Sequence, residues 1–392
     1  MTRSPSNDIT WPDTLDHAVF FASYWQQTPL VIPEALTPAS DWPEAKDVLD
    51  VAAEPDADSR LVIRDNDTFR VTEGPLQGLE SMIRDSEVAW TVLVQAMEVW
   101  FPTLHSLFDV FSFLPRWRFD DLMISVSGHG GGVGAHVDQY DVFLLQIAGD
   151  RRWSWGGPVG APVEGSPLRQ VAGFSPIETR DFGPGDILYL PPGVVHDGVA
   201  LNEGAMTLSI GFRSPGVTDL VAALADVVDE RWLGDTESEP RYRDNGRQAA
   251  SNPYELDDHD LGGMIALFQN ALKDRDLLTR AIGVQVTLPR LGPDSLEFEV
   301  TREAIERCLT QGGWLERWSG SRLAYARADQ SEAILFFDGV SAPVTLAFAQ
   351  DIVERERIDH KTWSCWQGDG RDRTCLLAMI GRGTFGLVID SD

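Results

Sequence analysis

The most informative stretch of this sequence is GGGVGAHVDQYD, residues 130–141, in which a glycine-rich loop leads into His136, Val137 and Asp138. In a β-strand, side chains two residues apart point to the same face, so the imidazole of His136 and the carboxylate of Asp138 would project into one place. Two histidines and one carboxylate form the facial triad that holds non-haem Fe(II) and leaves further coordination positions open. The stretch therefore predicts two of the three ligands of such a site.

A second stretch, GDILYLPPGVVH at residues 185–196, supplies the remaining ligand. It contains a turn, an apolar strand, a Pro-Pro-Gly turn and then His196, in the order that is typical of the last metal ligand of cupin barrels. The Pro-Pro-Gly turn ends the strand sharply, which allows the histidine to face back into the barrel. An isolated His-x-Asp pair is common by chance, but the two half-motifs in this order predict a metal site made of His136, Asp138 and His196.

The sequence around these motifs consists of short β-rich runs separated by glycine and proline, a texture typical of a sandwich or barrel. Before it, residues 1–115 carry mixed helical and loop signals, including an amphipathic stretch at 79–100. After it, apolar stripes at three-to-four spacing predict helices at 220–232 and 261–272, joined by a polar connection. The strands are expected at 122–127, 142–147, 151–155, 187–190 and 206–212, and the last hundred residues should add a helix at 302–310 and strands at 323–326, 333–337 and 385–389.

An open iron centre needs a co-substrate that supplies electrons, and the far carboxylate of 2-oxoglutarate needs a cation. Arginine suits this task because its planar guanidinium binds a carboxylate through two hydrogen bonds. The strand that follows Asp138 turns at residues 148–150 and returns with Arg151 and Arg152, of which one should point into the barrel. We expect Arg151 to do so, helped by a hydroxyl of Ser127 or Ser125, although a pair of solvated strand charges is the alternative.

Strand alternation extends the predicted site. Tyr140 continues the face of His136 and Asp138, and one face of the preceding strand carries a further set of side chains. A carboxylate, a phenol and a thioether around one site would suit a basic, partly aliphatic side chain such as arginine or lysine, although each residue could equally belong to an ordinary core or rim. The set on the preceding strand consists of Asp121, Met123, Ser125 and Ser127.

The composition excludes several classes of protein. The 392 residues correspond to two or three domains, and 43% hydrophobic residues are typical of a globular chain. A net charge of −29 argues against direct nucleic-acid binding and membrane association, and indicates either a solvated acidic surface or attraction of a basic partner. Three cysteines without a Cys-x-x-Cys spacing, and an amino terminus without a signal peptide, favour a cytoplasmic protein.

With these motifs in hand, the chain resembles the JmjC-type ribosomal oxygenases, and specifically the bacterial arginine hydroxylases of a large-subunit ribosomal protein. The resemblance covers about residues 115–215 and implies an α+β fold with a double-stranded β-helix core, the cupin or JmjC jelly roll. It further implies three domains: a JmjC oxygenase domain with an N-terminal elaboration (1–215), a helical dimerisation domain (216–290) and a winged-helix-like domain (291–392). The matching stretches are DDLMIS, GGGVGAHVDQYDVFLLQ, RRW, PGDILYLPPG with the following histidine, and SIGFRSP.

The resemblance also implies roles for individual residues. The iron ligands fall on His136, Asp138 and His196, and the 2-oxoglutarate contacts fall on Arg151 and Ser127. A single basic residue at position 151 fits the arginine-directed branch, since the related histidine hydroxylases are similar with lysine there. The substrate-binding residues fall on Asp121, Met123, Tyr140 and Ser209. The sequence departs from the family pattern after Ser127, where Gly128 and His129 replace a more apolar pair. This difference affects the expected shape of the glycine-rich loop and not the expected chemistry.

The implied activity is hydroxylation by Fe(II), 2-oxoglutarate and O2 of an arginine side chain in a basic ribosomal protein, by a homodimeric enzyme. An apolar surround such as Leu144, Trp153 and Leu188 would protect the reactive centre. Two alternatives remain. The same chemistry acting on an N-methyl group would make the protein a demethylase, and a non-catalytic cupin module could bind a partner without turnover. A degenerate module would be expected to lose one of its key residues, and all four of these are present: His136, Asp138, His196 and Arg151.

Overall fold

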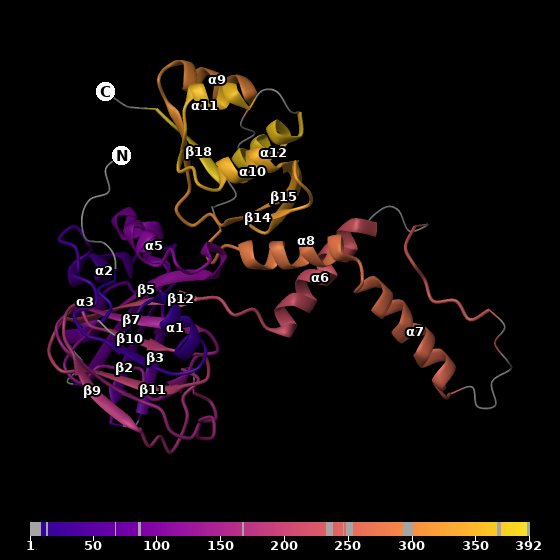
Figure 1. Cartoon of the computed structure of the whole chain (residues 1–392). Helices are drawn as coiled ribbons and strands as arrows, with labels where there is room; N and C mark the ends of the chain where they lie inside the picture. The colour runs from indigo at the N-terminus through magenta and orange to yellow at the C-terminus, as the bar shows by residue number, and fades with distance from the viewer. Residues whose placement is uncertain are drawn as a thin grey trace. The chain divides into compact units, whose positions relative to one another are not determined.

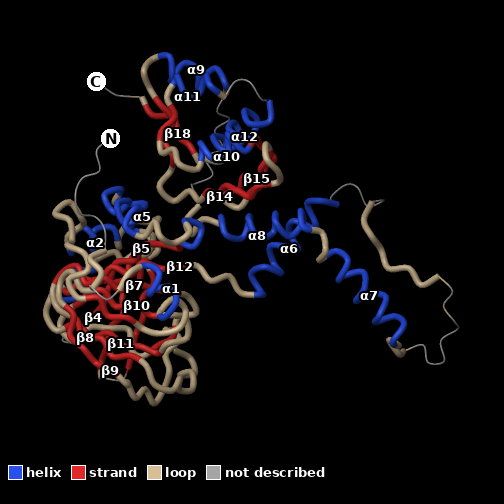
Figure 2. Tube along the Cα trace, viewed as in Figure 1, coloured by secondary structure: helices blue, strands red, loops and turns tan. Residues whose placement is uncertain are grey.

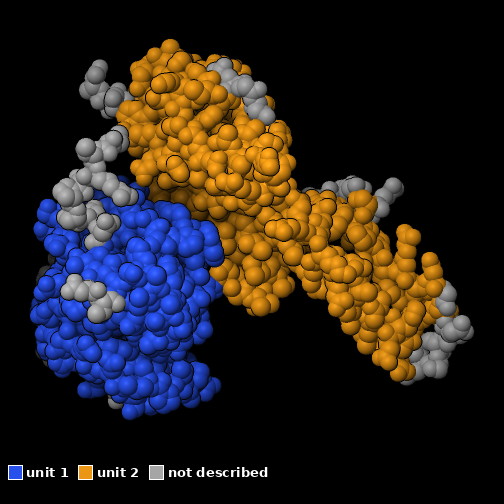
Figure 3. Space-filling view, viewed as in Figure 1, with its two compact units in different colours: residues 1–214 blue, residues 215–392 orange. Residues whose placement is uncertain are grey.

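The computed structural model describes residues 9–12, 15–66, 68–84, 88–166, 168–232, 238–245, 247, 254–292, 301–366 and 370–389. The chain divides into two compact units, residues 1–214 and residues 215–392 (Figure 3). Each unit has its own hydrophobic core.

The first unit is built on two antiparallel sheets, which Figure 2 shows as the strand-rich part of the chain. From β5 to β12 the chain passes back and forth between the two sheets, except that β8 and β9 both lie in the smaller sheet, and this arrangement confirms the predicted α+β fold with a jelly-roll core. The smaller sheet has the order β6-β11-β8-β9, with β6 (His136–Val137), β8 (Arg151–Trp155), β9 (Glu178–Phe182) and β11 (Val195–Ala200). The larger sheet has the order β1-β10-β7-β12-β5-β4-β2-β3, with β1 (Leu30–Ile32), β2 (Ser59–Asp65), β3 (Thr68–Glu73), β4 (Ala89–Val94), β5 (Phe119–Ser127), β7 (Asp141–Ala148), β10 (Ile187–Leu190) and β12 (Ala205–Phe212).

All five strands predicted around the metal motifs are present, whereas the interpretation of residues 79–100 as one amphipathic stretch is wrong. This stretch contains α3 (Leu79–Arg84), β4 and α4 (Met97–Trp100). Val92 and Val94 are buried in the core, while Thr91 faces the opposite side and pairs with Ser127 of β5. The alternating burial in β4 therefore has the two-residue period of a strand and not the period of a helix. The four strands β1 to β4 were not predicted from the sequence.

The larger sheet has one face against the main core and the other towards the smaller sheet. Along β5, the side chains of Leu122, Ile124 and Val126 belong to the main core, so residues 121, 123, 125 and 127 face the interior of the jelly roll. Short helices lie against the core side of this sheet, and most of them contribute buried side chains to the core (Figure 1). Burial of each large apolar side chain stabilises the fold by about 1.5–3 kcal/mol. The helices are α1 (His17–Ser23), α2 (Ala45–Val51), α5 (Ser106–Val110) and the 3-10 helices η1 (Pro102–His105) and η2 (Arg116–Arg118).

A buried polar network ties this N-terminal layer to the start of β7. The Tyr189 hydroxyl donates to Asp141 Oδ1 (2.7 Å), while Gln26 Nε2 and Arg118 Nη2 each donate to Asp141 Oδ2 (2.9 Å). The backbone N–H of Gln26 donates in turn to the Tyr189 hydroxyl (2.8 Å). Asp141 is fully buried, and its carboxylate accepts hydrogen bonds from three segments that lie far apart in the sequence.

The second unit combines helices with two three-stranded sheets, of order β17-β13-β18 and β14-β15-β16. The helices predicted at 220–232, 261–272 and 302–310 are present, whereas α8 was not predicted. Asp257, Asp274 and Thr301 cap the amino termini of α7, α8 and α9 with their side chains. The elements are α6 (Val217–Trp232), α7 (Asp258–Ala271), α8 (Arg275–Thr287), α9 (Arg302–Thr310), β13 (Trp314–Arg317), β14 (Leu323–Arg327), β15 (Glu332–Phe337), β16 (Val340–Thr345), α10 (Leu346–Ile352), β17 (Arg357–Ile358), α11 (His360–Cys365), α12 (Gly370–Gly381) and β18 (Phe385–Val388).

None of the helices in the described part of the chain combines the length and the hydropathy that a bilayer crossing requires.

Candidate metal centre and co-substrate site

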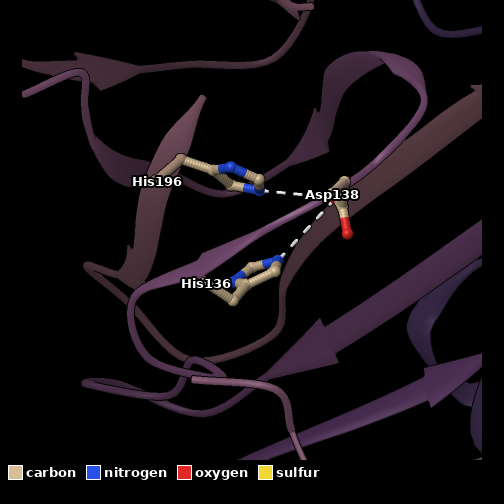
Figure 4. Close-up of side chains that lie close together, drawn as sticks. All are labelled: His136, Asp138 and His196. Atoms are coloured by element: carbon tan, nitrogen blue, oxygen red, sulfur yellow. Dashed lines mark ion pairs between the residues drawn. The ribbon is translucent and has the colours of Figure 1, made fainter. Parts of the chain in front are cut away.

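Two neighbouring strands of the smaller sheet bring the predicted metal ligands together. His136 lies in β6, Asp138 follows that strand directly, and His196 of β11 stands opposite His136 in the antiparallel register. The two imidazole rings have centroids 4.2 Å apart. Nε2 of His136 lies 3.9 Å, and Nε2 of His196 3.6 Å, from Oδ2 of Asp138 (Figure 4). One ligand atom from each residue lies within 4.8 Å of the others, a spacing that could hold a metal ion.

The hydrogen bonds of both imidazoles direct Nε2 towards this point. Nδ1 of His136 lies 2.9 Å from the carbonyl oxygen of Gly134, and Nδ1 of His196 lies 3.0 Å from that of Val194. A carbonyl oxygen only accepts hydrogen bonds, so the proton belongs on Nδ1 and the lone pair on Nε2. Burial, together with the neighbouring His136, lowers the pKa of His196 to about 4 and so keeps the ring neutral. Metal-binding histidines commonly show this arrangement.

The Pro-Pro-Gly turn connects the backbone of Asp138 to the strand that carries His196. Strand β10 ends at Leu190 and β11 begins at Val195, so the Pro-Pro-Gly turn and Val194 make up the whole connection. Gly193 has a positive φ of 85°, a conformation that glycine adopts without strain, and its N–H donates to the carbonyl oxygen of Asp138 (2.8 Å). The turn thus fixes the backbone of Asp138 next to the strand that carries His196.

Arg151 lies at the start of β8 with its side chain inside the jelly roll, only 4% exposed. Nη2 donates to Ser127 Oγ (2.7 Å) and Nη1 to the carbonyl oxygen of Gly198 (3.5 Å). Burial lowers its pKa to about 10, which still leaves it charged at neutral pH. The buried Nε of Arg151 has no hydrogen-bond partner among the described residues, so one donor is available for a carboxylate.

The other arginine of the pair points the opposite way. Arg152 is exposed, and its Nε and Nη2 donate to the two carboxylate oxygens of Asp181 in β9 (2.7 and 2.8 Å). Of the two serines considered as helpers, Ser127 contacts Arg151, whereas Ser125 Oγ donates to the carbonyl oxygen of Thr207 (3.4 Å). The strand alternation therefore brings Arg151 and Ser127 into contact inside the jelly roll and leaves Arg152 exposed.

The predicted substrate residues come from three segments. Met123 of β5 stands directly opposite Ser209 of β12 in the antiparallel register. Asp121, two residues before Met123, is buried and its Oδ2 accepts a hydrogen bond from the N–H of Ala96 (3.2 Å). Tyr140 lies between β6 and β7 with its side chain 39% exposed. The structure thus brings Met123 and Ser209 together, with Asp121 on the same face of β5, while Tyr140 comes from the strand connection next to Asp138.

One residue next to the site, Thr91, escaped the sequence interpretation. Thr91 of β4 shares a hydrogen bond with Ser127 (Oγ1 to Oγ, 3.0 Å) and so supports the serine that contacts Arg151. The alternating run AWTVLV at residues 89–94 was the signal that would have found this strand.

The unexpected glycine at 128 has a steric cause, because a Cβ there would lie 2.4 Å from Nε1 of Trp90. The expected apolar surround of Leu144, Trp153 and Leu188 is buried in one cluster.

One family model and two curated proteins match this chain in sequence. Residues 106–220 match the family model of the JmjC domain. The ribosomal protein uL16 3-hydroxylase of Escherichia coli (strain K12) is 38% identical over 252 residues, which cover 64% of this chain and 65% of that protein. A probable ribosomal oxygenase of Haemophilus influenzae is 36% identical over 230 residues, covering 57% of this chain and 56% of that protein. The chain thus aligns with between about half and two thirds of the length of these curated relatives.

Solved structures match over nearly the whole chain. A crystal structure of E. coli YcfD has a TM-score of 0.79 at 29% sequence identity and covers 95% of this chain and 98% of that one. The structure of the ribosomal oxygenase YcfD from Escherichia coli in complex with cobalt and 2-oxoglutarate has a TM-score of 0.78 at 28% identity, covering 97% and 99%. The part of the chain that forms the jelly roll therefore matches the JmjC domain, and the chain is similar to proteins that are named as ribosomal oxygenases.

Proposed function

We propose that this protein is an Fe(II)- and 2-oxoglutarate-dependent hydroxylase that acts in the cytoplasm on an arginine side chain of a large-subunit ribosomal protein. The observation that carries the proposal is the convergence of His136, Asp138 and His196, with ligand atoms within 4.8 Å of one another, in a jelly roll that also buries Arg151. A relative is named as a hydroxylase of a ribosomal protein, and a related structure holds cobalt and 2-oxoglutarate.

The donor set suits a ferrous ion. Two neutral imidazoles and one carboxylate are the ligands of the non-haem Fe(II) oxygenases. In both imidazoles Nδ1 donates a hydrogen bond to a carbonyl oxygen, which leaves Nε2 as the atom that can bind the metal. Bound Fe(II), with 2-oxoglutarate and O2, supplies the oxidising power that inserts one oxygen atom into a C–H bond and leaves succinate and CO2. His136, Asp138 and His196 hold the ion, and the remaining residues place the reactants.

Arg151 and Ser127 are proposed to bind the far carboxylate of 2-oxoglutarate. The guanidinium is held by Ser127 and by the Gly198 carbonyl, so it is already oriented before a ligand arrives. Its free Nε donor offers a charge-assisted hydrogen bond in a site with little exposure to water. Thr91 keeps the Ser127 hydroxyl in place.

Asp121, Met123, Tyr140 and Ser209 are proposed to receive the substrate arginine. The carboxylate of Asp121 would pair with the guanidinium, and Met123, opposite Ser209, would contact the aliphatic part of the side chain. The net charge of −29 favours a basic partner, because opposite charges speed association and lower the probability of wrong partners. The arginine target is thus supported by the residue chemistry of the site and of the surface.

The test is mass spectrometry of ribosomal proteins from cells that carry either the wild-type protein or the variant His136→Ala. We expect one arginine to gain a single oxygen atom, about 16 Da, in the wild type and to lose that gain in the variant, because the metal loses a ligand. His129→Ala is the matched control, since His129 is an exposed histidine of the neighbouring glycine loop.

Two results would contradict the proposal. Identical spectra from wild type and His136→Ala would exclude ribosomal hydroxylation by this site. Loss of a methyl group with release of formaldehyde, in place of a gain of oxygen, would identify a demethylase instead.

A further inference from the structure

The segment that joins β8 to β9 returns to the strand that carries His136. Gln170 of this segment forms an isolated antiparallel bridge with His136, and the N–H of Val171 donates to the carbonyl oxygen of Ala135 (2.9 Å). Strand β6 already has β11 on its other side. The returning segment therefore covers the second edge of the metal-ligand strand.

The side chain of Gln170 is buried, at 8% exposure, and both ends of its amide are hydrogen bonded. Nε2 donates to the carbonyl oxygen of Val133 (2.7 Å), and Oε1 accepts from the hydroxyl of Ser166 (2.9 Å). The network assigns the orientation of the amide, because Val133 offers only an acceptor at this position. The amide thus binds the glycine loop two to three residues ahead of His136.

The same amide packs against Gly134, whose carbonyl oxygen accepts the hydrogen bond from Nδ1 of His136. A Cβ at Gly134 would lie 2.4 Å from Nε2 of Gln170 and 2.9 Å from the ring of Phe69, and the φ of Gly134 is 80°. The carbonyl oxygen of Gly134 lies 2.9 Å from Nδ1 of His136. A continuous chain of contacts therefore leads from Ser166 through Gln170 to the loop carbonyl that sets the tautomer of a predicted metal ligand.

We propose that Gln170 is a positioning residue for His136, which holds the Val133–Gly134 backbone so that His136 presents Nε2 to the metal. This inference rests on the metal site of the proposed function. Without the Nε2 donor the loop carbonyls are free to turn, and the hydrogen bond that orients the His136 ring is lost. Groups that orient metal ligands in this way typically contribute 10- to 100-fold in metal affinity.

The test is a titration of the purified full-length protein with Co2+, in the absence of substrate, followed by the visible absorption of the bound ion. We expect Gln170→Ala to weaken Co2+ binding roughly 10-fold or more and to change the absorption bands, because the ligand geometry changes. Gln146→Ala is the matched control. Gln146 is also buried and bonds two carbonyl oxygens and a hydroxyl, those of Ala148, Gly149 and Thr207, and the variant should bind Co2+ as the wild type does.

Gln170→Glu separates hydrogen bonding from packing. It keeps the shape of the side chain and the acceptor for Ser166 but lacks the donor to Val133, and its negative charge would by itself attract a cation. Weaker Co2+ binding by this variant would therefore support the role of the donor. Wild-type affinity in Gln170→Glu, or in both variants, would overturn the inference. If the wild-type protein itself bound no Co2+, the metal site would be overturned and this inference with it.

Discussion

At the scale of single residues, burial separates two adjacent arginines into different roles. Arg151 is buried and hydrogen bonded to Ser127, whereas Arg152 is exposed and paired with Asp181. A buried cation with an unsatisfied donor is costly unless a partner arrives, and an exposed ion pair contributes little. The chemistry of the two side chains is identical, so position alone makes Arg151 the candidate for binding an anionic co-substrate.

We expect Arg151→Ala to raise the concentration of 2-oxoglutarate needed for half-maximal turnover by about 10-fold or more, since a hydrogen bond to a charged group contributes about 1.5–3 kcal/mol. Succinate formation measured against 2-oxoglutarate concentration is the readout. Arg152→Ala is the control and should leave the curve unchanged, because its side chain faces solvent beside Asp181. An unchanged requirement in Arg151→Ala would remove this residue from the co-substrate site.

At the scale of elements, Asp141 joins the jelly roll to its N-terminal layer. It begins β7, three residues after Asp138, and accepts hydrogen bonds from Gln26, Arg118 and Tyr189. Arg118 belongs to η2 and Gln26 follows α1, so one carboxylate connects elements far apart in the sequence. The segments that pack over the larger sheet are thereby tied to the strand that leaves the metal site.

Asp141→Ala should lower the free energy of unfolding by about 3–5 kcal/mol, because it leaves the half-buried guanidinium of Arg118, the buried hydroxyl of Tyr189 and the amide of Gln26 without their acceptor. Chemical denaturation of the purified protein measures this loss. Asp181→Ala, which also removes an aspartate paired with an arginine but at an exposed site, should leave the denaturation midpoint nearly unchanged. Equal stability of the two variants would show that the network contributes nothing.

At the scale of the whole molecule, α7 carries an apolar stripe that the described residues leave exposed. The side chains of this stripe are between 37% and 59% exposed, a surface that soluble proteins commonly bury against a partner. This favours the proposal that residues 216–290 form a dimerisation domain in which the stripe meets a second copy of the chain. The stripe consists of Leu261, Met264, Ile265, Phe268 and Leu272.

Phe268→Glu should convert a dimer into a monomer, because it places a charge at the most exposed position of the stripe. Light scattering coupled to gel filtration would report half the wild-type mass. Asn270→Glu is the control, since it adds the same charge to an exposed residue of α7 that is two positions after Phe268 and lies on the opposite face of the helix. A monomeric wild type, or a variant that stays dimeric, would contradict the proposal.

The sequence alone predicted the three residues of the candidate metal site and the strands next to them. His136 and Asp138 lie two residues apart beside a glycine loop, and His196 follows a Pro-Pro-Gly turn. These patterns are local, because side-chain alternation and turn geometry depend on a few neighbouring residues. The strands around them and the helices at 220–232 and 261–272 were predicted for the same reason.

Only the tertiary structure decided how distant segments meet. It turned part of residues 79–100 into β4, which pairs with β5, and so brought Thr91 to Ser127. It buried Arg151 while leaving Arg152 exposed, and it returned Gln170 to the edge of β6, thirty-four residues along the chain from His136. Strand pairing and burial depend on partners far apart in the sequence, so local patterns carry no record of them.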